Sequence, residues 1–588
     1  MKGRRGGGGR MGVCSWTIRE VWRIYFDEMT ATATDSKDEK KTEVPMINVQ
    51  VDGEWKAFPK GTKLIEACIK SGQYVPHYCY HPKLSTPGNC RMCLVELGMP
   101  KRDAERNVVM GEDGKPEIAW GPRPAISCAT EISEGMGVRT ESPMVEECRK
   151  GVMEFLLINH PLDCPICDQA GECTLQEFSV EFGNGGSRFL DEKVKKPKRV
   201  DIGKHIVLDD ERCIMCSRCI RFMQEVAEDD VLGFMNRGSH TTLSVYPGKR
   251  LDNNYALNTV DICPVGALTS KDFRFQMRVW FLKETKTIDV NCGTGANVLV
   301  GSRENTVYRI TPRENDEVNS CWMPDSHRLN FHYLNDEARL TQPVVKGAEA
   351  PTKWSDAIRA AGDALRQFQG EEIAIIASAR MTNEELYLTK RLAKSLGAGE
   401  IEVLARPQEG DGFLISKDGN PNTTGAKLLG VTSDEPGSRL WAINSGIEAG
   451  TIKALICLGE DATDCGISEG HLEKLACLVT TAILPNATTR AATVVLPSAG
   501  FTEKRGSMIN LKGRIQRLNR ATSSPGQARD DWEILRDLIQ AVGGSNGIYA
   551  IEEVFKAMAA DVPALQGLSL IKIGDLGTEL QLAEGSSR

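Results

Sequence analysis

The sequence lacks any long hydrophobic run. Hydrophobic residues make up 41% of its 588 residues, but they never form the roughly 18 consecutive apolar positions that a membrane-spanning helix needs. It also lacks a strong charge of either sign, because 72 Lys and Arg stand against 80 Asp and Glu, for a net charge of −8. This balance gives no general attraction to nucleic acid or to an anionic membrane. We therefore expect no membrane span and no nucleic-acid partner.

Two further features are missing. The sequence has no N-terminal stretch of apolar residues followed by a small-residue cleavage site, so we predict no secretory signal peptide. In the second half of the chain, the turns that follow strand candidates contain neither Gly-x-Gly-x-x-Gly nor a Walker-type Gly-Lys-Ser/Thr. We therefore expect no cradle for a dinucleotide or a phosphate there.

Cysteine, by contrast, is abundant and unevenly placed. Of 19 cysteines, twelve fall between Cys79 and Cys263, while the last 325 residues hold five. A disulfide scaffold is typical of short secreted chains. Clustered cysteines in a long chain of this kind indicate metal sites instead.

The first set of cysteines lies in a loop that contains Pro82, Pro87 and Gly88. Ten residues separate its first two members, whereas plant-type ferredoxins use four, but the later Cys-x-x-Cys pair and the distant fourth cysteine match that type. Four thiolates can hold a [2Fe-2S] cluster, and zinc is the alternative. His77 and His81 flank the first cysteine, and we interpret them as polar neighbours because no second Cys-x-His pair supports a Rieske centre. The set is Cys79, Cys90, Cys93 and Cys128.

The second set combines three cysteines and one histidine within fourteen positions. Zinc accepts three thiolates and one imidazole, so the residue types alone do not decide between zinc and a [4Fe-4S] cluster with one histidine ligand. Replacing a thiolate by a neutral imidazole removes one negative charge and, to first order, raises the reduction potential. The set is His160, Cys164, Cys167 and Cys173.

The third set gives the most specific signal in the chain. A Cys-x-x-Cys-x-x-Cys run is followed 44 positions later by a Cys-Pro, the pattern with which two-cluster ferredoxins hold a [4Fe-4S] cluster. The cysteines for a second cluster of that fold are replaced by Met223, Asn253, Ala256 and Thr259. The pattern therefore predicts one [4Fe-4S] cluster, on Cys213, Cys216, Cys219 and Cys263.

The remaining pattern predicts two kinds of fold. Alternation over residues 47–58, with an Asp52-Gly53 turn, predicts a hairpin, and Thr62 is placed to cap a helix that ends near Gly72, with Cys68 as a packing residue. Such a start is typical of a ferredoxin-like β-grasp. Later, strand candidates alternate with helical patterns, which predicts a mainly parallel α/β sheet. The strand candidates are 372–378, 454–459, 478–484 and 493–497, and the helical patterns are 353–369, 383–396 and 532–542.

The order of the three sets resembles one family. Together with the strings His-Pro-Leu-Asp-Cys-Pro-Ile-Cys-Asp and Asp-Ile-Cys-Pro-Val-Gly-Ala-Leu, it resembles the large iron–sulfur subunit of NADH-quinone oxidoreductase (respiratory complex I). Beyond Arg278 the chain is similar to that family's molybdopterin-oxidoreductase-type domain, with recognisable strings at 338–345, 494–497 and 513–517.

The resemblance implies a role as an electron-transfer subunit. Electrons from NADH pass through flavin and clusters of a neighbouring subunit, cross this chain's clusters and leave toward quinone, while the whole complex translocates ions. The first set matches the [2Fe-2S] ligands and the other two match [4Fe-4S] ligands, for one [2Fe-2S] and two [4Fe-4S] clusters. The implied partners are the flavin- and NADH-binding subunit and the small iron–sulfur subunits of the peripheral arm. The chain would lie on the cytoplasmic side of the inner membrane, or on the matrix side in a mitochondrion, and touch the membrane only through the complex.

The resemblance also divides the chain into segments. These are a disordered or wrongly assigned N-terminal extension (1–45), a [2Fe-2S] ferredoxin-type domain (46–143), a histidine-ligated [4Fe-4S] domain (144–184), a ferredoxin-like [4Fe-4S] domain (205–284), a degenerate [4Fe-4S] domain of the molybdenum/tungsten-enzyme type (285–341) and an α/β molybdopterin-oxidoreductase-like domain (342–588).

One departure separates this chain from some family members, which carry a further [4Fe-4S] cluster before the α/β domain. Here Cys292 is followed by Gly295 and Leu299, and Pro324 stands where the distant ligand is expected, with Cys321 out of step. We predict that this cluster is absent and that no molybdopterin is bound. The alternatives are the catalytic subunit of a molybdenum-dependent formate dehydrogenase, an iron-only hydrogenase and a zinc-stabilised scaffold.

Overall fold

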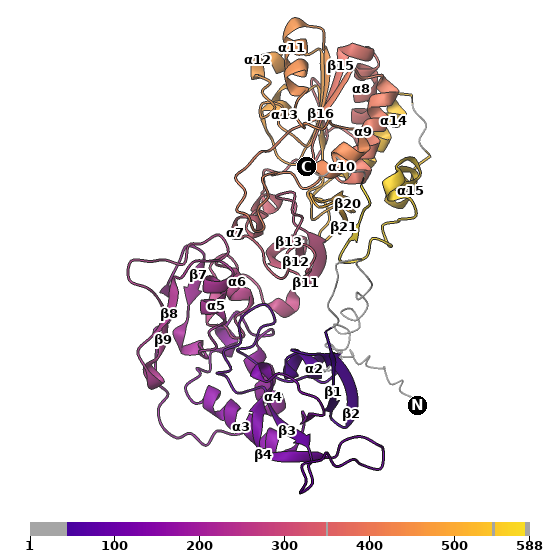
Figure 1. The fold of residues 1–588 in the computed structure, drawn as a ribbon. Helices are drawn as coiled ribbons and strands as arrows, with labels where there is room; N and C mark the ends of the chain where they lie inside the picture. The colour runs from indigo at the N-terminus through magenta and orange to yellow at the C-terminus, as the bar shows by residue number, and fades with distance from the viewer. Residues whose placement is uncertain (1–43, 349–350, 544–546, 583–588) are drawn as a thin grey trace, which may run out of the picture. The chain divides into compact units, whose positions relative to one another are not determined.

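The computed structural model describes residues 44–348, 351–543 and 547–582, so almost all of the extension predicted for residues 1–45 lies outside the described part. The chain forms two compact units (Figure 1). The N-terminal unit comprises residues 44–202, 207–251 and 262–268, and the C-terminal unit comprises residues 203–206 and 252–261 and the described residues from 269 onward. Within the described ranges, every helix is too short or too polar to cross a membrane.

The N-terminal unit begins with a five-stranded mixed sheet. Strands β1 (Met46–Val51) and β2 (Glu54–Pro59) pair antiparallel, and Asp52 and Gly53 turn the chain between them with positive φ angles of 46° and 92°. Because β1 also pairs in parallel with β5, the sheet has the mixed order β2-β1-β5-β3-β4. This arrangement confirms the predicted hairpin. The other strands are β3 (Leu94–Pro100), β4 (Ile118–Ile126) and β5 (Gly137–Arg139).

Helix α2 (Leu64–Lys70) packs against this sheet. Cys68 is fully buried in the shared core, as expected of a packing residue. The predicted cap at Thr62 is wrong, because the Thr62 hydroxyl donates to the Pro59 carbonyl at 2.7 Å and Lys63 precedes the helix without a side-chain cap. Gly72 follows the last turn with a φ of 82°, a conformation that ends helices and favours glycine.

The remainder of the N-terminal unit consists of short elements joined by long loops. Helices α3 and α4 pack on each other, and the buried Tyr78 lies between them, donating to Met153 Sδ at 3.3 Å and contacting the Phe178 ring at a centroid distance of 5.1 Å. The loops that carry the predicted ligands connect these elements. The elements are α3 (Pro143–Leu157), α4 (Thr174–Phe182), β6 (Val200–Asp201), β7 (Ile206–Leu208), α5 (Arg218–Glu225), β8 (Leu232–Met235) and β9 (Thr242–Val245).

The C-terminal unit starts with the short helix α6 (Asn258–Asp261) and an antiparallel sheet of β11 (Lys283–Ile288), β12 (Asn297–Arg303) and β13 (Thr306–Pro312). The short helix α7 (Asp325–Arg328) follows. A second antiparallel sheet, formed near the end of the chain, contains β20 (Gly506–Ile509), β21 (Arg514–Leu518) and β22 (Thr578–Glu579).

The core of the C-terminal unit is a six-stranded sheet in the order β14-β19-β18-β17-β15-β16. Its pairs are parallel except for β14 and β19, which are antiparallel. Helices cover both faces (Figure 1). The strands are β14 (Val344–Val345), β15 (Ile373–Ala377), β16 (Glu400–Val403), β17 (Ala454–Leu458), β18 (Cys477–Ala482) and β19 (Val494–Pro497).

The two faces of the sheet bury alternate residues of each strand. Ile373 and Ile375 belong to the core on one face, and Ala374 and Ile376 to the core on the other. The first face is covered by α8 (Trp354–Leu365), α9 (Asn383–Leu396), α10 (Thr423–Leu429), α14 (Asp531–Ala541) and α15 (Ile551–Asp561), and the second by α11 (Leu440–Ala449), α12 (Glu469–Leu472) and α13 (Ala487–Ala491). Since both faces are buried, the strands are continuously apolar. The predicted α/β alternation is confirmed.

Candidate metal centres

The first set lies beside the mixed sheet of the N-terminal unit. Three cysteines belong to the loop between α2 and β3, and Cys128 lies in the single 3₁₀ turn (Ser127–Ala129) after β4. The Cys79 amide donates to Cys90 Sγ at 3.5 Å. Hydrogen bonds from the Cys128 thiol lower the pKa of both Cys79 and Cys93. The structure thus brings together all four predicted residues, and hydrogen bonds among them favour the thiolate form of Cys79 and Cys93, the form that binds metal.

The two histidines beside this set are engaged by the backbone. His77 Nδ1 lies 2.8 Å from the Val75 carbonyl oxygen, and His81 Nδ1 accepts from the Lys83 amide at 3.2 Å. Burial, followed by the charge of Arg218, lowers the pKa of His77 to about 4 and that of His81 to about 3. Both rings are therefore neutral at ordinary pH, and their role as polar neighbours rather than ligands stays a prediction.

The second set lies between α3 and α4. Cys164 begins a 3₁₀ turn (Cys164–Ile166) and is exposed, whereas Cys167 and Cys173 are buried, with Cys173 directly before α4. Burial, followed by the charges of Arg212 and Lys193, lowers the pKa of His160 to about 4. The imidazole is therefore neutral, which is the form that binds metal.

The third set surrounds a small cavity. Cys219 belongs to the first turn of α5, and all four cysteines of the set line this cavity together with residues such as Val265 and Leu268. Met215 and Ser217 have positive φ angles of 56° and 61°, so the backbone between the first three cysteines curls tightly, a strained conformation that is characteristic of functional loops. Burial raises the pKa of Cys216 to about 11, so this thiol needs a metal to lose its proton readily.

Two arginines of α5 connect the first set to the third. Arg221 Nη2 donates to the carbonyl of Cys79 at 2.5 Å and to that of Cys216 at 3.5 Å. Arg218 donates to the carbonyls of Tyr80 at 2.5 Å and Ile262 at 3.2 Å. Each guanidinium therefore touches the backbone next to both sets.

The third set also contacts the second. A Cβ atom built at Gly266, in the Cys-Pro-Val-Gly string, would overlap Cys167 Sγ. The buried Arg212 donates to the Gly266 carbonyl at 3.3 Å and to Asp163 Oδ2 at 3.0 Å, next to Cys164. The third set thus contacts both of the other sets. The spacing of cysteines alone did not reveal Arg212, Arg221 or the role of Gly266.

The segment in which we predict that a further [4Fe-4S] cluster is absent lies at the start of the C-terminal unit. Gly295 has a φ of 63°, Leu299 is part of β12, and Pro324 precedes α7. Cys292, however, is fully buried beside Asp289 and His327, two residues that were not predicted. The three lie within 38 positions of one another, without the close spacing that usually reveals a site in a sequence. Three further cysteines outside the sets, Cys457, Cys465 and Cys477, are buried in the two cores, as expected for packing residues.

Five family models match the chain in order. They describe a 2Fe-2S iron-sulfur cluster binding domain (residues 44–143), the NADH-ubiquinone oxidoreductase-G iron-sulfur binding region (149–188), the NADH-quinone oxidoreductase subunit 3 ferredoxin-like domain (203–269), an NADH-ubiquinone oxidoreductase NDSU1/NuoG-like 4Fe-4S domain (282–332) and a molybdopterin oxidoreductase (419–541). The chain therefore contains [2Fe-2S]- and [4Fe-4S]-binding domains followed by a molybdopterin-oxidoreductase domain, the order of folds that the sequence predicts.

Curated relatives carry matching names. A subunit of the NADH-quinone oxidoreductase of Rickettsia felis is 39% identical over 360 residues, which are 61% of this chain and 50% of the relative, so the chain spans about half the length of that protein. A solved structure of an NAD+-reducing [NiFe]-hydrogenase in the H2-reduced state aligns with a TM-score of 0.33 and 27% identity, over 40% of this chain and 91% of that one.

One relative is matched over almost its whole length. The mitochondrial NADH-ubiquinone oxidoreductase 78 kDa subunit of Neurospora crassa is 30% identical over 694 aligned positions, which cover 96% of this chain and 90% of that protein. Together with the three cysteine sets and the five matched domains, this similarity shows that the chain belongs to the family of the large iron–sulfur subunit of NADH-quinone oxidoreductases.

Proposed function

We propose that this chain is an electron-transfer subunit of an NADH-quinone oxidoreductase and that it holds one [2Fe-2S] and two [4Fe-4S] clusters. The first set would hold the [2Fe-2S] cluster and the second and third sets the two [4Fe-4S] clusters. When bound, such clusters supply one-electron transfer at potentials set by their ligands and surroundings. The chain would carry electrons from NADH and flavin on a partner subunit toward quinone.

The donor chemistry of the described residues fits these clusters. Clusters take thiolates, and the first set already holds Cys79 and Cys93 with lowered pKa values through the Cys128 thiol. The third set surrounds a cavity with four sulfur atoms. The second set offers a neutral imidazole on His160 and two buried thiols. The cysteines of the three sets carry thiols rather than disulfides, as cluster ligands must.

The observation that carries the proposal is the continuous contact from set to set. Arg221 bonds the backbone of Cys79 and Cys216, and Gly266 packs on Cys167. These contacts support the order first set, third set, second set for a relay. Arg212 and Arg221 are both buried, and their hydrogen bonds hold the backbone of the loops beside the sets. Their positive charges also favour the thiolate form of the ligands near them.

We further propose that the partners are a flavin- and NADH-binding subunit and the small iron–sulfur subunits of a peripheral arm. The chain would lie on the cytoplasmic face of the inner membrane, or on the matrix face in a mitochondrion, and touch the membrane only through the complex. The apolar side chains beside the second set support a protein partner there, because Leu162 is 88% exposed and Ile166 is 60% exposed. Exposed apolar groups of this size are typical of interfaces.

The second candidate function is catalysis at molybdenum, as in a formate dehydrogenase. The match of residues 419–541 to a molybdopterin oxidoreductase favours it. Metal analysis of the chain after anaerobic purification separates the two. The relay requires about 10 iron atoms per chain, from one two-iron and two four-iron clusters, and no stoichiometric molybdenum or tungsten. Stoichiometric molybdenum would favour the catalytic function, and zinc in place of iron would overturn both.

A further inference from the structure

The start of the C-terminal unit contains a cluster of metal-binding side chains that belongs to none of the three sets. Asp289 and Cys292 lie in the turn between β11 and β12, and His327 lies in α7. One ligand atom from each residue lies within 4.8 Å of the corresponding atoms of the other two. We propose that Asp289, Cys292 and His327 bind a single Zn²⁺ ion that fastens the β11–β12 turn to α7.

The donor types and their separation suit this ion. Zinc bonds to cysteine sulfur at about 2.3 Å and to histidine nitrogen and carboxylate oxygen at about 2.0–2.2 Å. Donors that surround one such ion therefore lie at most about 4.5 Å apart, close to the limit of 4.8 Å within which the three donors lie here. His327 Nδ1 and Asp289 Oδ2 are 2.6 Å apart and share a hydrogen bond, so the ion would take the place of the shared proton and these two atoms would move slightly apart.

The charges of the three side chains also balance the ion. The exposed fraction is 0% for Cys292, 3% for Asp289 and 7% for His327. A thiolate, a carboxylate and a neutral imidazole carry two negative charges, which a divalent cation neutralises at a site that water barely reaches. Binding releases the thiol proton of Cys292, because only the thiolate is a ligand, and it displaces the proton that His327 Nδ1 and Asp289 Oδ2 share.

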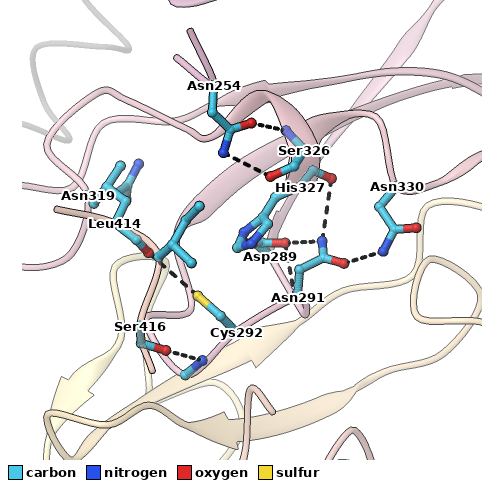
Figure 2. Close-up of polar contacts among 12 residues, drawn as sticks. Asn254, Asp289, Asn291, Cys292, Asn319, Ser326, His327, Asn330, Leu414 and Ser416 are labelled. Carbon is cyan, nitrogen blue, oxygen red and sulfur yellow. Dashed lines mark hydrogen bonds and ion pairs between the residues drawn. The ribbon is translucent and has the colours of Figure 1, made fainter. Parts of the chain in front are cut away.

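Neighbouring side chains hold Asp289 and His327 in place (Figure 2). Asn291 Nδ2 donates to Asp289 Oδ1 at 2.5 Å and to the His327 carbonyl at 3.4 Å, and Asn330 in turn donates to Asn291 Oδ1 at 2.6 Å. Second hydrogen bonds to a ligating carboxylate are typical of metal sites in proteins. The Asn291 side chain is thus a positioning residue that links the turn to α7.

A loop of the same unit closes over the sulfur. Figure 2 shows the Cys292 thiol directed at the Leu414 carbonyl, and the two atoms are 3.5 Å apart. Ser416 Oγ accepts from the Gly293 amide at 3.1 Å, which ties this loop to the residue after Cys292. The carbonyl of Leu414 is an oxygen donor beside the sulfur, so a fourth ligand is within reach for the tetrahedral shell that zinc prefers.

An iron–sulfur cluster does not fit the same place. Residues 282–332 match a family model for a 4Fe-4S domain, but this stretch contains only Cys292 and Cys321 as thiols. Cys321 is not among the three residues whose ligand atoms converge. A cluster of four irons needs three or four such ligands, whereas a single zinc ion accepts this mixed set.

Zinc binding is tested on the full chain, purified anaerobically with its iron. The chain is equilibrated in buffers of fixed free Zn²⁺, and its zinc and iron contents and the zinc K-edge absorption are measured. We expect one zinc per chain with a single sulfur at about 2.3 Å and the other donors at about 2.0–2.2 Å. Cys292→Ser and His327→Gln should each weaken zinc binding by more than about tenfold, the lower limit for loss of an outer partner. Cys321→Ser, in the same stretch, is the matched control and should bind as the parent does.

A further variant tests the proposal even if substitution of a ligand unfolds the turn between β11 and β12. Asn291→Ala keeps all three donors and should weaken zinc binding by about 10- to 100-fold. The iron content should stay constant in every variant, so the result does not depend on the proposed relay. The proposal is overturned if the parent chain retains no zinc, if the absorption shows zinc bound by sulfur alone, or if Cys292→Ser and Asn291→Ala bind zinc as the parent does.

Discussion

Gly266 is the residue at which two predicted cluster sites touch. It lies three positions after Cys263 and packs on the sulfur of Cys167, a ligand candidate of the second set. The backbone can approach this sulfur closely only because glycine carries no side chain. Gln169 Cβ would lie 3.1 Å from an added Cβ atom, so the loop of the second set has little room to move away.

Gly266→Ala should therefore displace Cys167 and release the cluster of the second set. We expect the iron content of the purified chain to fall from about 10 to about 6 atoms, since one four-iron cluster is lost. The matched control is Gly151→Ala in α3, where an added Cβ meets no atom within 4 Å. Alanine there should keep all the iron, because it favours a helix over glycine by up to about 1 kcal/mol. Full iron in Gly266→Ala would contradict the close packing of the two sets.

At the scale of helices and strands, local pattern predicted part of the C-terminal unit. The prediction for residues 383–396 coincides with α9, and 372–378 contains β15, because buried parallel strands and capped amphipathic helices have distinct apolar patterns. Strand β16 was missed, since its four residues include two glutamates. The predicted cap at Thr62 was wrong, because Lys63 directly precedes the helix and the Thr62 hydroxyl donates to the Pro59 carbonyl instead.

The cysteine sets were predictable because their members follow a local sequence pattern. Ligands of one cluster recur at short, fixed spacings, so a sequence displays them. The contacts between sets are not periodic. Arg221 and Cys79 are 142 positions apart, and His327 and Asp289 are 38 positions apart. Such pairs come into contact only in the tertiary fold, so no local sequence pattern predicts them.

The first turn of α9 makes the stability of the C-terminal unit depend on pH. Glu384 is fully buried, where its carboxylate accepts from the Ser507 amide and hydroxyl at 2.9 Å. Burial nevertheless raises the pKa of Glu384 to about 7 from 4.5. Between these two values the folded chain holds a proton that the unfolded chain has lost, so the free energy of unfolding falls as the pH rises through this window. The loss above pH 7 is on the order of 3 kcal/mol.

Glu384→Gln removes this titration and keeps an oxygen for the Ser507 amide. At pH 8 the variant should unfold at a higher temperature than the parent, and at pH 5, where the parent side chain is neutral too, the two should unfold together. Differential scanning calorimetry of the full chain checks this difference. Glu371→Gln, at an exposed position of the same unit, should change neither value. A variant that is less stable at pH 8 would show that Glu384 is needed as a charged group.

At the scale of the whole molecule, the two units differ in their chemistry. The loops of the N-terminal unit carry the three sets of candidate ligands. Two buried arginines, Arg212 and Arg221, form hydrogen bonds that connect the loops of these sets. The apolar residues of the C-terminal unit form the cores on the two faces of a sheet that helices cover on both sides. Electron relay in the proposed function therefore depends on the first unit, and a substitution at one set should interrupt the whole path.

The middle of the relay gives the sharpest test. In the assembled complex, Cys216→Ser and Cys263→Ser should each abolish NADH-driven quinone reduction, because the third set is the middle one of the proposed relay and its loss leaves a gap that electrons cannot cross. Reduction of ferricyanide by NADH at the flavin site of the partner should stay largely intact, since that reaction bypasses this chain. Cys148→Ser, in α3 of the same unit and outside the three sets, should affect neither activity. Unchanged quinone reduction in an assembled complex that carries Cys216→Ser would refute the relay, whereas loss of both activities would indicate failed assembly, which subunit composition on a native gel detects.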